Sequence, residues 1–195
     1  MSCRVTPAVR SMENAGVAFQ LLEYDYDPSA DAIGLQAAQV LGQSPSTVFK
    51  TLIVALDSGK LVCAIIPSDT RLNLKAIASA AGAKKAELSD PKKAERITGA
   101  ISPLGQRKRL RSFIDASAPV LNEIVVNGGQ RGLQMVLRPA DLILATSAMV
   151  VSFAETSARK PSRPSSGRST SPPVRARRCL NCGPVLRARR ALGPV

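Results

Sequence analysis

Hydrophobic and polar positions alternate along this chain in two ways, some with the period of a strand and some with the period of a helix. One long apolar run, Thr47–Leu56, is rich in β-branched residues and contains a single charge, Lys50, so it predicts a buried strand. The residues after it, Asp57 to Gly59, have the composition of a tight turn and lead into a second apolar run, Lys60–Ile66. The sequence therefore predicts an antiparallel hairpin, around which we expect the rest of the chain to be organised.

Helices are predicted where a capping residue precedes periodic apolar positions and a glycine or proline ends them. The expected helices are Pro7–Asn14, Ala30–Leu41, Leu74–Ala80, Pro91–Ile97 and Pro139–Ala145. The further expected strands are Val17–Tyr24, Ala83–Leu88, Phe113–Asp115, Glu123–Val126, Gly132–Leu137 and Met149–Phe153. Because helices and strands mix without strict alternation, and one hairpin is antiparallel, the sequence predicts an α+β fold with a mixed sheet and flanking helices.

Residues 1–158 and 159–195 differ in composition, which indicates one domain followed by a tail. The first stretch has 17 Lys and Arg against 14 Asp and Glu, whereas the second has 10 Lys and Arg and no acid. The second stretch also lacks aromatic residues and periodicity, so we expect it to be disordered. A basic tail of this kind either holds RNA through its phosphates or has no selected role, since reading a GC-rich gene out of frame gives a similar composition.

Composition excludes several kinds of site. The chain has no His, which removes the commonest general base, Ser-His triads and His-ligated metals. Aromatic residues make up only 3% of the chain, which argues against a platform that stacks bases. Cys63 lies within an apolar run and is predicted to be a core residue. Cys179 and Cys182 lack a second pair of ligands, so an accident of the tail is favoured over a zinc site.

The chain contains no segment typical of a signal peptide or a membrane span. Met1–Ser11 has no apolar core, and no stretch reaches the roughly 18 apolar residues that a membrane helix needs. We therefore expect a cytoplasmic protein with no membrane partner.

Two local features are candidates for a functional site. Lys50 either extends to solvent from the start of its strand or projects into a cleft, because an unpaired buried ammonium costs several kcal/mol. The segment Thr98–Gln106 is either a structural loop or a place where backbone N–H groups bind a phosphate or a developing oxyanion.

Five motifs occur in a fixed order, and together they are more specific than either feature alone. They are Val48-Phe-Lys-Thr-Leu52, Leu74-Lys75 with Gly82-Ala-Lys-Lys85, Ala94-Glu-Arg-Ile-Thr-Gly99, Ile101-Ser-Pro-Leu-Gly-Gln106 and Asn127-Gly-Gly-Gln-Arg-Gly-Leu133. This set closely resembles the YbaK/EbsC family, within the superfamily of YbaK and prolyl-tRNA-synthetase editing domains. The resemblance covers roughly Thr6 to Phe153 and implies a partly barrel-like mixed sheet.

The resemblance also implies a function and a chemistry. Members are cytoplasmic aminoacyl-tRNA deacylases that act in trans, near prolyl-tRNA synthetase, on Cys-tRNA(Pro) and on Cys-tRNA(Cys). The thiol of the substrate attacks its own ester carbon and releases a thiolactone, so no metal or organic cofactor is implied. The protein positions the ester, excludes bulkier side chains and polarises the carbonyl. Related branches that remove alanine use a pocket histidine, so the absence of His favours the cysteine branch.

The resemblance assigns roles to particular residues. Lys50 is expected to contact the terminal adenosine and its ester, and Tyr24 either lines the pocket or is an ordinary half-buried strand residue. The expected pocket also includes Gly99, Ser102, Pro103, Gly105 and Gln134. The basic residues Arg107, Lys108, Arg109 and Arg131 either meet the tRNA acceptor stem or form a solvated face.

The chain departs from the family pattern in three places of the expected pocket. Several residues, including a tyrosine and a glycine, are missing between Gly99 and Ala100. Ala100 replaces a second glycine, although alanine does not adopt positive φ freely. Gln134 replaces an aspartate, and a neutral amide stabilises a nearby cation less than a carboxylate does. A non-catalytic member that only binds tRNA or a synthetase is therefore a second hypothesis, and an RNA-binding protein acting through its tail is a third.

Overall fold

The hairpin predicted from the two apolar runs lies at the centre of the larger sheet. Its strands are β2, Phe49–Leu56, and β3, Leu61–Pro67, and they pair antiparallel with Lys50 opposite Ile66. The computed structural model describes residues 5–27, 33–99, 102–156 and 177–179. The other strands of this sheet are β5 (Ala86–Leu88), β6 (Arg111–Asp115) and β9 (Met149–Val151). The strand order is β5-β2-β3-β6-β9, with parallel pairing of β3 to β6 and of β6 to β9.

A second, smaller sheet is antiparallel throughout. Its four strands are β11 (Arg177–Cys179), β1 (Gln20–Glu23), β8 (Leu133–Leu137) and β7 (Ile124–Asn127), in that order. The expected strand Val17–Tyr24 is thus shorter than predicted. It begins at Gln20, where its pairing with Val136 of β8 begins.

Three short strands were not predicted from the sequence. One is β11, which lies in the segment expected to be a disordered tail; the other residues of that segment, Cys182 included, fall outside the described residues. The second and third are β4 (Thr70–Leu72) and β10 (Ala154–Thr156), which pair only with each other. A three-residue strand is too short for an alternating pattern, so a partner backbone rather than its own side chains defines it.

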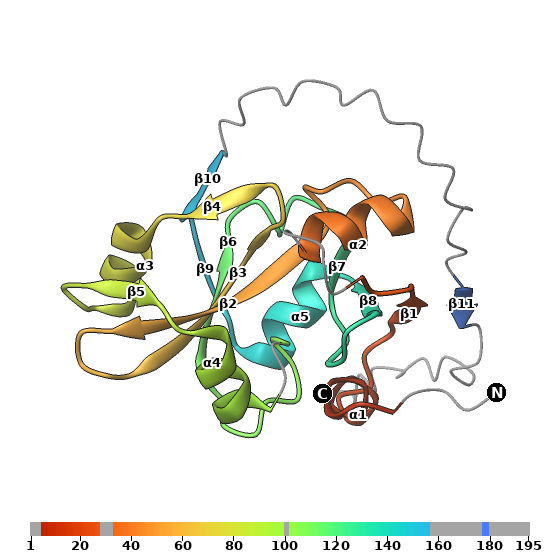
Figure 1. Ribbon diagram of the computed structural model, residues 1–195, viewed down its shortest axis with the longest axis horizontal. Helices are drawn as coiled ribbons and strands as arrows, with labels where there is room; N and C mark the ends of the chain where they lie inside the picture. Colours follow the sequence, from red (N-terminus) through yellow and green to blue (C-terminus); the bar gives the residue numbers. More distant parts are fainter. Residues whose placement is uncertain (1–4, 28–32, 100–101, 157–176, 180–195) are drawn as a thin grey trace, which may run out of the picture.

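The two larger sheets meet at the start of β2. Val48 and Val125 form an isolated parallel bridge, and the amide of Val125 donates to the carbonyl of Thr47 at 2.9 Å. Figure 1 shows β7, β8 and β1 continuing beyond this end of β2. The join gives the mixed, partly barrel-like sheet that the sequence predicted, and that prediction is confirmed.

Within the residues that the structure describes, five helices flank the sheets, as predicted. They are α1 (Pro7–Asn14), α2 (Ile33–Leu41), α3 (Leu74–Ala81), α4 (Pro91–Thr98) and α5 (Pro139–Thr146). The Thr6 and Asn73 side chains cap α1 and α3 by accepting from the amides of Val9 and Ala76. The first three residues expected in α2 fall outside the described residues. None of these helices is both long enough and apolar enough to cross a membrane, within the part of the chain that was described.

The core consists of aliphatic clusters on both faces of the five-stranded sheet. The larger cluster packs α1 and α5 against β2, β3, β6 and the second sheet, and a smaller one packs α3 against the opposite face. Cys63 is fully buried in the larger cluster, and burial raises the pKa of its thiol to about 12. The prediction that Cys63 is a core residue is confirmed. A third cluster, formed by Ala38, Val48 and Val125, packs α2 over the join between the sheets.

Asp115 fastens the C-terminal part of the fold to β6. Its carboxylate is buried and accepts from the amide and hydroxyl of Ser117 at 2.9 and 2.7 Å. It also accepts from the amides of Phe153 and Ala154 at 3.0 and 2.8 Å. Burial opposes ionisation, but these four hydrogen bonds outweigh it, so the pKa of Asp115 lies below its ordinary value. The expected strand Met149–Phe153 ends earlier than predicted, as β9 at Val151, because the Phe153 and Ala154 amides turn to the Asp115 carboxylate before β10 begins.

We expect Asp115→Asn to lower the free energy of unfolding near neutral pH by about 1–3 kcal/mol, because buried amides lose a charged acceptor. The lowered pKa means that the carboxylate stabilises the fold above its unfolded value of about 3.9, and that this contribution is lost as the pH falls through the folded value. Urea unfolding at neutral and acidic pH should therefore show the difference between the two proteins shrinking on acidification. The exposed Glu87→Gln is the matched control, and a gap that stayed constant with pH would contradict this role.

Candidate functional site

Lys50 lies on β2 and its ammonium is held by backbone carbonyls. Nζ donates to the carbonyl oxygen of Thr70 at 2.6 Å and to that of Ser68 at 3.2 Å. The side chain is half-buried, and burial lowers the pKa of Lys50, with Arg71 adding to the effect and Asp69 opposing it. An ammonium has three N–H donors, and two acceptors lie against it among the described residues, so one donor remains for a ligand. Lys50 is therefore a positioned cation with one donor to spare.

The segment that holds Lys50 is itself fixed by short contacts. The amide and hydroxyl of Ser68 both donate to the carbonyl of Val48, at 2.8 and 2.7 Å. Helix α2 packs closely over this point, since a Cβ atom on Gly34 would lie 2.6 Å from Ser68 Oγ and 3.8 Å from Lys50 Cβ. Only glycine allows α2 to approach so closely, so Gly34 and Ser68 set the geometry around the lysine.

Alternation along the strands places Lys50, Gln134 and Tyr24 on the side that α2 covers. Lys50 shares a face of β2 with Val48, and Gln134 shares a face of β8 with Val136. Leu22 of β1 is paired with Gln134, so the two side chains lie on the same face. Tyr24 is two residues after Leu22 and therefore lies on that face as well. Val48 and Val136 both pack in the third cluster beneath α2. Three residues that the resemblance assigned to the pocket thus belong to one face of the joined sheets.

Tyr24 and Gln134 form a buried polar pair. Both are more than nine-tenths buried, and the Gln134 side chain lies close enough to the tyrosine hydroxyl to affect its pKa. Burial raises the pKa of Tyr24, and Tyr26 adds to the shift, whereas the hydrogen bonds with Gln134 and with the Gly132 backbone oppose it. Tyr24 is therefore a neutral donor near neutral pH, and Gln134 is a neutral partner for it.

Ser102 joins the loop after α4 to the end of β7. Its hydroxyl donates to the carbonyl of Asn127 at 2.8 Å and accepts from the amide of Leu104 at 3.2 Å. Gln106 braces the same loop, because its side chain donates to the Ser102 carbonyl and accepts from the Leu110 amide. These bonds occupy the Ser102 hydroxyl as both donor and acceptor, so its role here is to fix the loop.

Pro103 and Gly105 lie on the side of the loop that faces α1 and α5. They line a cavity of about 160 Å³ together with Ser11, Arg109 and Thr146, and Lys50 does not line it. Gly105 has φ +64°, and a Cβ atom there would lie 2.4–2.5 Å from the backbone of the first residues of α1. The packing of this loop against α1 therefore requires glycine at position 105, independently of any role of Gly105 in binding.

Gly99 ends α4 and packs against Arg107. It has φ +86°, and a Cβ atom there would approach the Arg107 side chain to 3.1 Å. The amide of Arg107 donates to the carbonyl of Thr98 at 3.0 Å, which closes the loop where several family residues are missing. Ala100 and Ile101, at the deletion itself, fall outside the described residues.

The four basic residues expected to meet tRNA do not form one patch. Arg109 donates to the Ala145 carbonyl and to Ser147 Oγ at the end of α5. Arg131 instead lies over the ring of Tyr26, 5.6 Å from its centroid, next to the Tyr24–Gln134 pair. Lys108 is exposed beside Arg107. Arg131 is thus the member of this set that lies nearest the Tyr24 end of the face.

Sequence reasoning missed the groups that hold Lys50. Ser68 and Thr70 act through their carbonyls, which any residue type has, so no side-chain pattern could have found them. Gly34 did leave a signal, because a glycine inside the predicted helix Ala30–Leu41 has no turn to make and indicates that another part of the chain packs closely there. Asn127, at the end of β7, likewise acts through its backbone, because its carbonyl accepts the bond that anchors Ser102.

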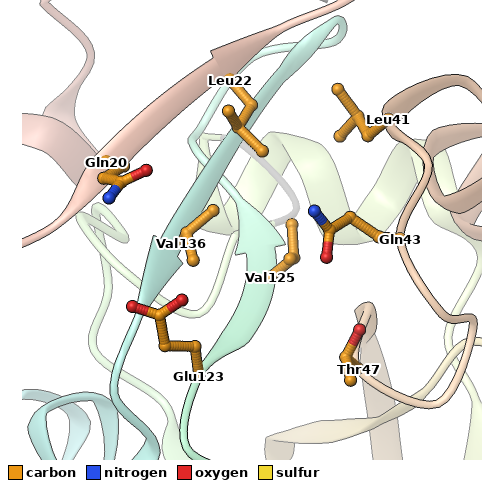
Figure 2. Close-up of a pocket in the computed structure, with 8 residues that line it drawn as sticks. All are labelled: Gln20, Leu22, Leu41, Gln43, Thr47, Glu123, Val125 and Val136. Carbon is orange, nitrogen blue, oxygen red and sulfur yellow. The ribbon is translucent and has the colours of Figure 1, made fainter. Parts of the chain in front are cut away.

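A larger cavity, of about 290 Å³, opens beside the C-terminal end of α2 (Figure 2). It lies on the face that carries Lys50, although Lys50 itself does not line it. Its walls are Gln20, Leu22, Leu41, Gln43, Thr47, Glu123, Val125 and Val136. Within the described ranges, no three His, Cys, Asp or Glu side chains gather as metal ligands would.

Comparison with known proteins agrees with the arrangement of these elements. The family model of the aminoacyl-tRNA editing domain matches residues 27–144. A protein of Enterococcus faecalis (strain ATCC 700802 / V583), provisionally named Cys-tRNA(Pro)/Cys-tRNA(Cys) deacylase EbsC, is 32% identical over 160 residues, which cover 80% of this chain and 94% of that protein.

Two crystal structures share the fold. A hypothetical protein superposes with a TM-score of 0.68 at 24% identity, over 77% of this chain and 100% of its own. A protein provisionally described as a trans-editing enzyme for prolyl-tRNA synthetase superposes with a TM-score of 0.64 at 20% identity, over 77% of this chain and 99% of its own. The chain therefore belongs to the aminoacyl-tRNA editing-domain family, in its YbaK/EbsC branch, whose activity is aminoacyl-tRNA deacylation.

Proposed function

We propose that this protein removes cysteine from Cys-tRNA(Pro), and from Cys-tRNA(Cys), as a trans-acting deacylase in the cytoplasm. The observation that carries the proposal is the Lys50 ammonium, held by two carbonyls with one N–H donor unused. The name of the Enterococcus faecalis relative, which covers most of this chain, supports the choice of cysteine. Prolyl-tRNA synthetase is the partner we expect to deliver the mischarged tRNA.

In the proposed reaction the substrate supplies its own nucleophile. The cysteine thiol loses its proton and attacks the ester carbon, forming a C–S bond and an oxyanion on the carbonyl oxygen. Collapse of this intermediate breaks the bond to the ribose oxygen, which takes up a proton, and releases a cyclic thiolactone. The free N–H of Lys50 donates to the developing oxyanion, and a fixed cation in a site shielded from water is well suited to stabilise it.

This chemistry fits the groups that the chain does and does not have. No histidine is present to act as a base. Cys63 is fully buried and its thiol has a pKa of about 12, so it is a poor nucleophile. Positioning by Lys50, with Tyr24 and Gln134 on the same face, is then the main contribution of the protein.

A second candidate function is binding without turnover. It is favoured by Gln134, which forms a neutral pair with Tyr24 where the family has a carboxylate. Lys50 therefore loses the nearby negative charge that we expect from an aspartate, while burial already lowers its pKa. In this alternative the protein binds aminoacyl-tRNA or the synthetase and hydrolyses little.

We expect Lys50→Ala to lower the rate of Cys-tRNA(Pro) hydrolysis by at least about 10²-fold, because the oxyanion loses its main electrostatic contact. Single-turnover assays with Cys-tRNA(Pro), Pro-tRNA(Pro) and Ala-tRNA(Pro) give both the rate and the amino-acid selectivity. The exposed Lys60→Ala, in the turn of the same hairpin, controls for loss of a positive charge, and thermal melting controls for folding. Wild-type rates in Lys50→Ala would remove Lys50 from the site.

The activity should also depend on pH through Lys50. Because burial lowers its pKa, the ammonium loses its proton at a lower pH than an ordinary lysine does. The rate enhancement should therefore be complete below this lowered value and fall as the pH rises through it. Dividing each rate by that of uncatalysed hydrolysis of the same substrate removes the titration of the substrate thiol. An enhancement that persists until ordinary lysines titrate would show that the charge of Lys50 is not needed.

Replacing Gln134 distinguishes deacylation from binding without turnover. We expect Gln134→Asp to raise the rate of cysteine removal by up to about tenfold, because a carboxylate favours the charged form of a neighbouring lysine. Gln134→Asn, which shortens the side chain equally but stays neutral, is the matched control. If both the wild-type protein and Gln134→Asp are folded and inactive, the binding function is the correct one.

A further inference from the structure

The cavity of about 290 Å³ beside α2 is a slot between the C-terminal end of that helix and the second sheet (Figure 2). Its apolar surface consists of Leu22 of β1, Val136 of β8, Val125 of β7 and Leu41 of α2. Small-molecule pockets begin at about 300 Å³, so the slot suits a single side chain better than a larger ligand.

The floor of the slot crosses three neighbouring strands. Val136 is the register partner of both Gln20 on β1 and Val125 on β7. The amide of Val125 donates to the carbonyl of Thr47 at 2.9 Å, so the backbone that leads into β2 lies on the far side of β7. Neighbouring strands are about 4.8 Å apart, so about 10 Å separates Val136 from Thr47. Only a long side chain reaches across this floor from one edge of the slot to the other.

The two sides of the slot carry different polar groups. Figure 2 shows Gln20 and Glu123 on one side and Gln43 and Thr47 on the other. Within the described residues, the side chains of Gln20, Gln43 and Glu123 form no hydrogen bond or ion pair. The Thr47 hydroxyl donates to the Ser44 carbonyl at 2.8 Å, so toward a ligand it can only accept. One side therefore offers a carboxylate, and the other offers groups that bind an amide.

We propose that this slot is an anchor site for an arginine side chain presented by a partner protein. The guanidinium forms a bidentate ion pair with the Glu123 carboxylate, and another of its N–H groups donates to the amide oxygen of Gln20. The methylene chain of the arginine lies along the apolar floor. On the opposite side, the peptide groups that flank the arginine bind the Gln43 amide and the Thr47 hydroxyl. No part of this recognition involves Lys50, so the inference stands whether or not the protein deacylates tRNA.

The charge of the slot selects a cation as its occupant. Among the described residues that line it, Glu123 is the only ionisable one. A carboxylate repels phosphates and acidic side chains, and an apolar occupant would remove its hydration without replacing it. Arginine is preferred to lysine because its planar guanidinium matches a carboxylate in two hydrogen bonds and is more weakly hydrated than an ammonium. Because no Lys or Arg lines the slot to bind the α-carboxylate of free arginine, a residue within a polypeptide suits it better.

The test measures binding of capped amino acids to the full chain by NMR of labelled Leu and Val methyl groups. N-acetyl-arginine amide should shift the methyl signals of Leu22, Val125 and Val136. N-acetyl-citrulline amide, which has the same shape but no charge, should bind about fivefold more weakly, because it loses the ion pair. Glu123→Gln should abolish this preference for arginine. Glu95→Gln, which removes an exposed carboxylate on α4, should keep it.

Four results would overturn the inference. Two are equal binding of the arginine and citrulline derivatives and a preference for arginine that survives Glu123→Gln. The third is free L-arginine binding about tenfold more tightly than its capped derivative, which would make a metabolite the occupant. The fourth is probe binding that appears only in the triple variant Arg187→Gln, Arg189→Gln and Arg190→Gln, which would show that the C-terminal residues of the chain itself fill the slot.

Discussion

The arrangement of the whole molecule depends on the parallel junction between the start of β2 and β7. A single bridge between Val48 and Val125 makes two sheets of different topology continuous. Without it, the face that carries Lys50 and the face that carries Tyr24 and Gln134 would belong to separate layers with no fixed relation. Helix α2 covers this junction through small residues, because Gly34 and Ala38 let its backbone approach the strands. The candidate site therefore forms only because the two sheets join. Helix α2 can cover it because the residues that face the strands, Gly34 and Ala38, are small.

The burial of Lys50 shows how a charge can be placed in an apolar strand. Two carbonyls replace part of the hydration of its ammonium group, while burial lowers the pKa of Lys50. Carbonyl dipoles hold the charge without cancelling it, which is the arrangement that electrostatic catalysis requires.

Much of the fold could be predicted because it depends on side chains whose types are visible in the sequence. Caps such as Thr6 and Asn73, and the two apolar runs around Gly59, each have a local physical meaning. The sequence did not reveal β4 and β10, since their pairing depends on backbone groups brought together by the rest of the fold. The site divides in the same way. Lys50 could be predicted from its isolated charge, whereas the carbonyls that hold it could not. Pro103 and Gly105, whose place in the binding pocket stays a prediction, line a cavity beside α1, where contact with Pro7 positions their loop.

The pairing of β4 with β10 links the lysine to the far end of the domain. Thr70, whose carbonyl holds Lys50, is the register partner of Thr156, and Asp115 anchors the start of β10 through Phe153 and Ala154. During synthesis on the ribosome, residue 50 emerges long before residue 156, so the setting of Lys50 stays incomplete until β10 is released. A chain that stops shortly before that strand would retain every side chain expected to act on the ester and still lack the support for its cation. Competence for this chemistry is thus acquired in one late step of biogenesis.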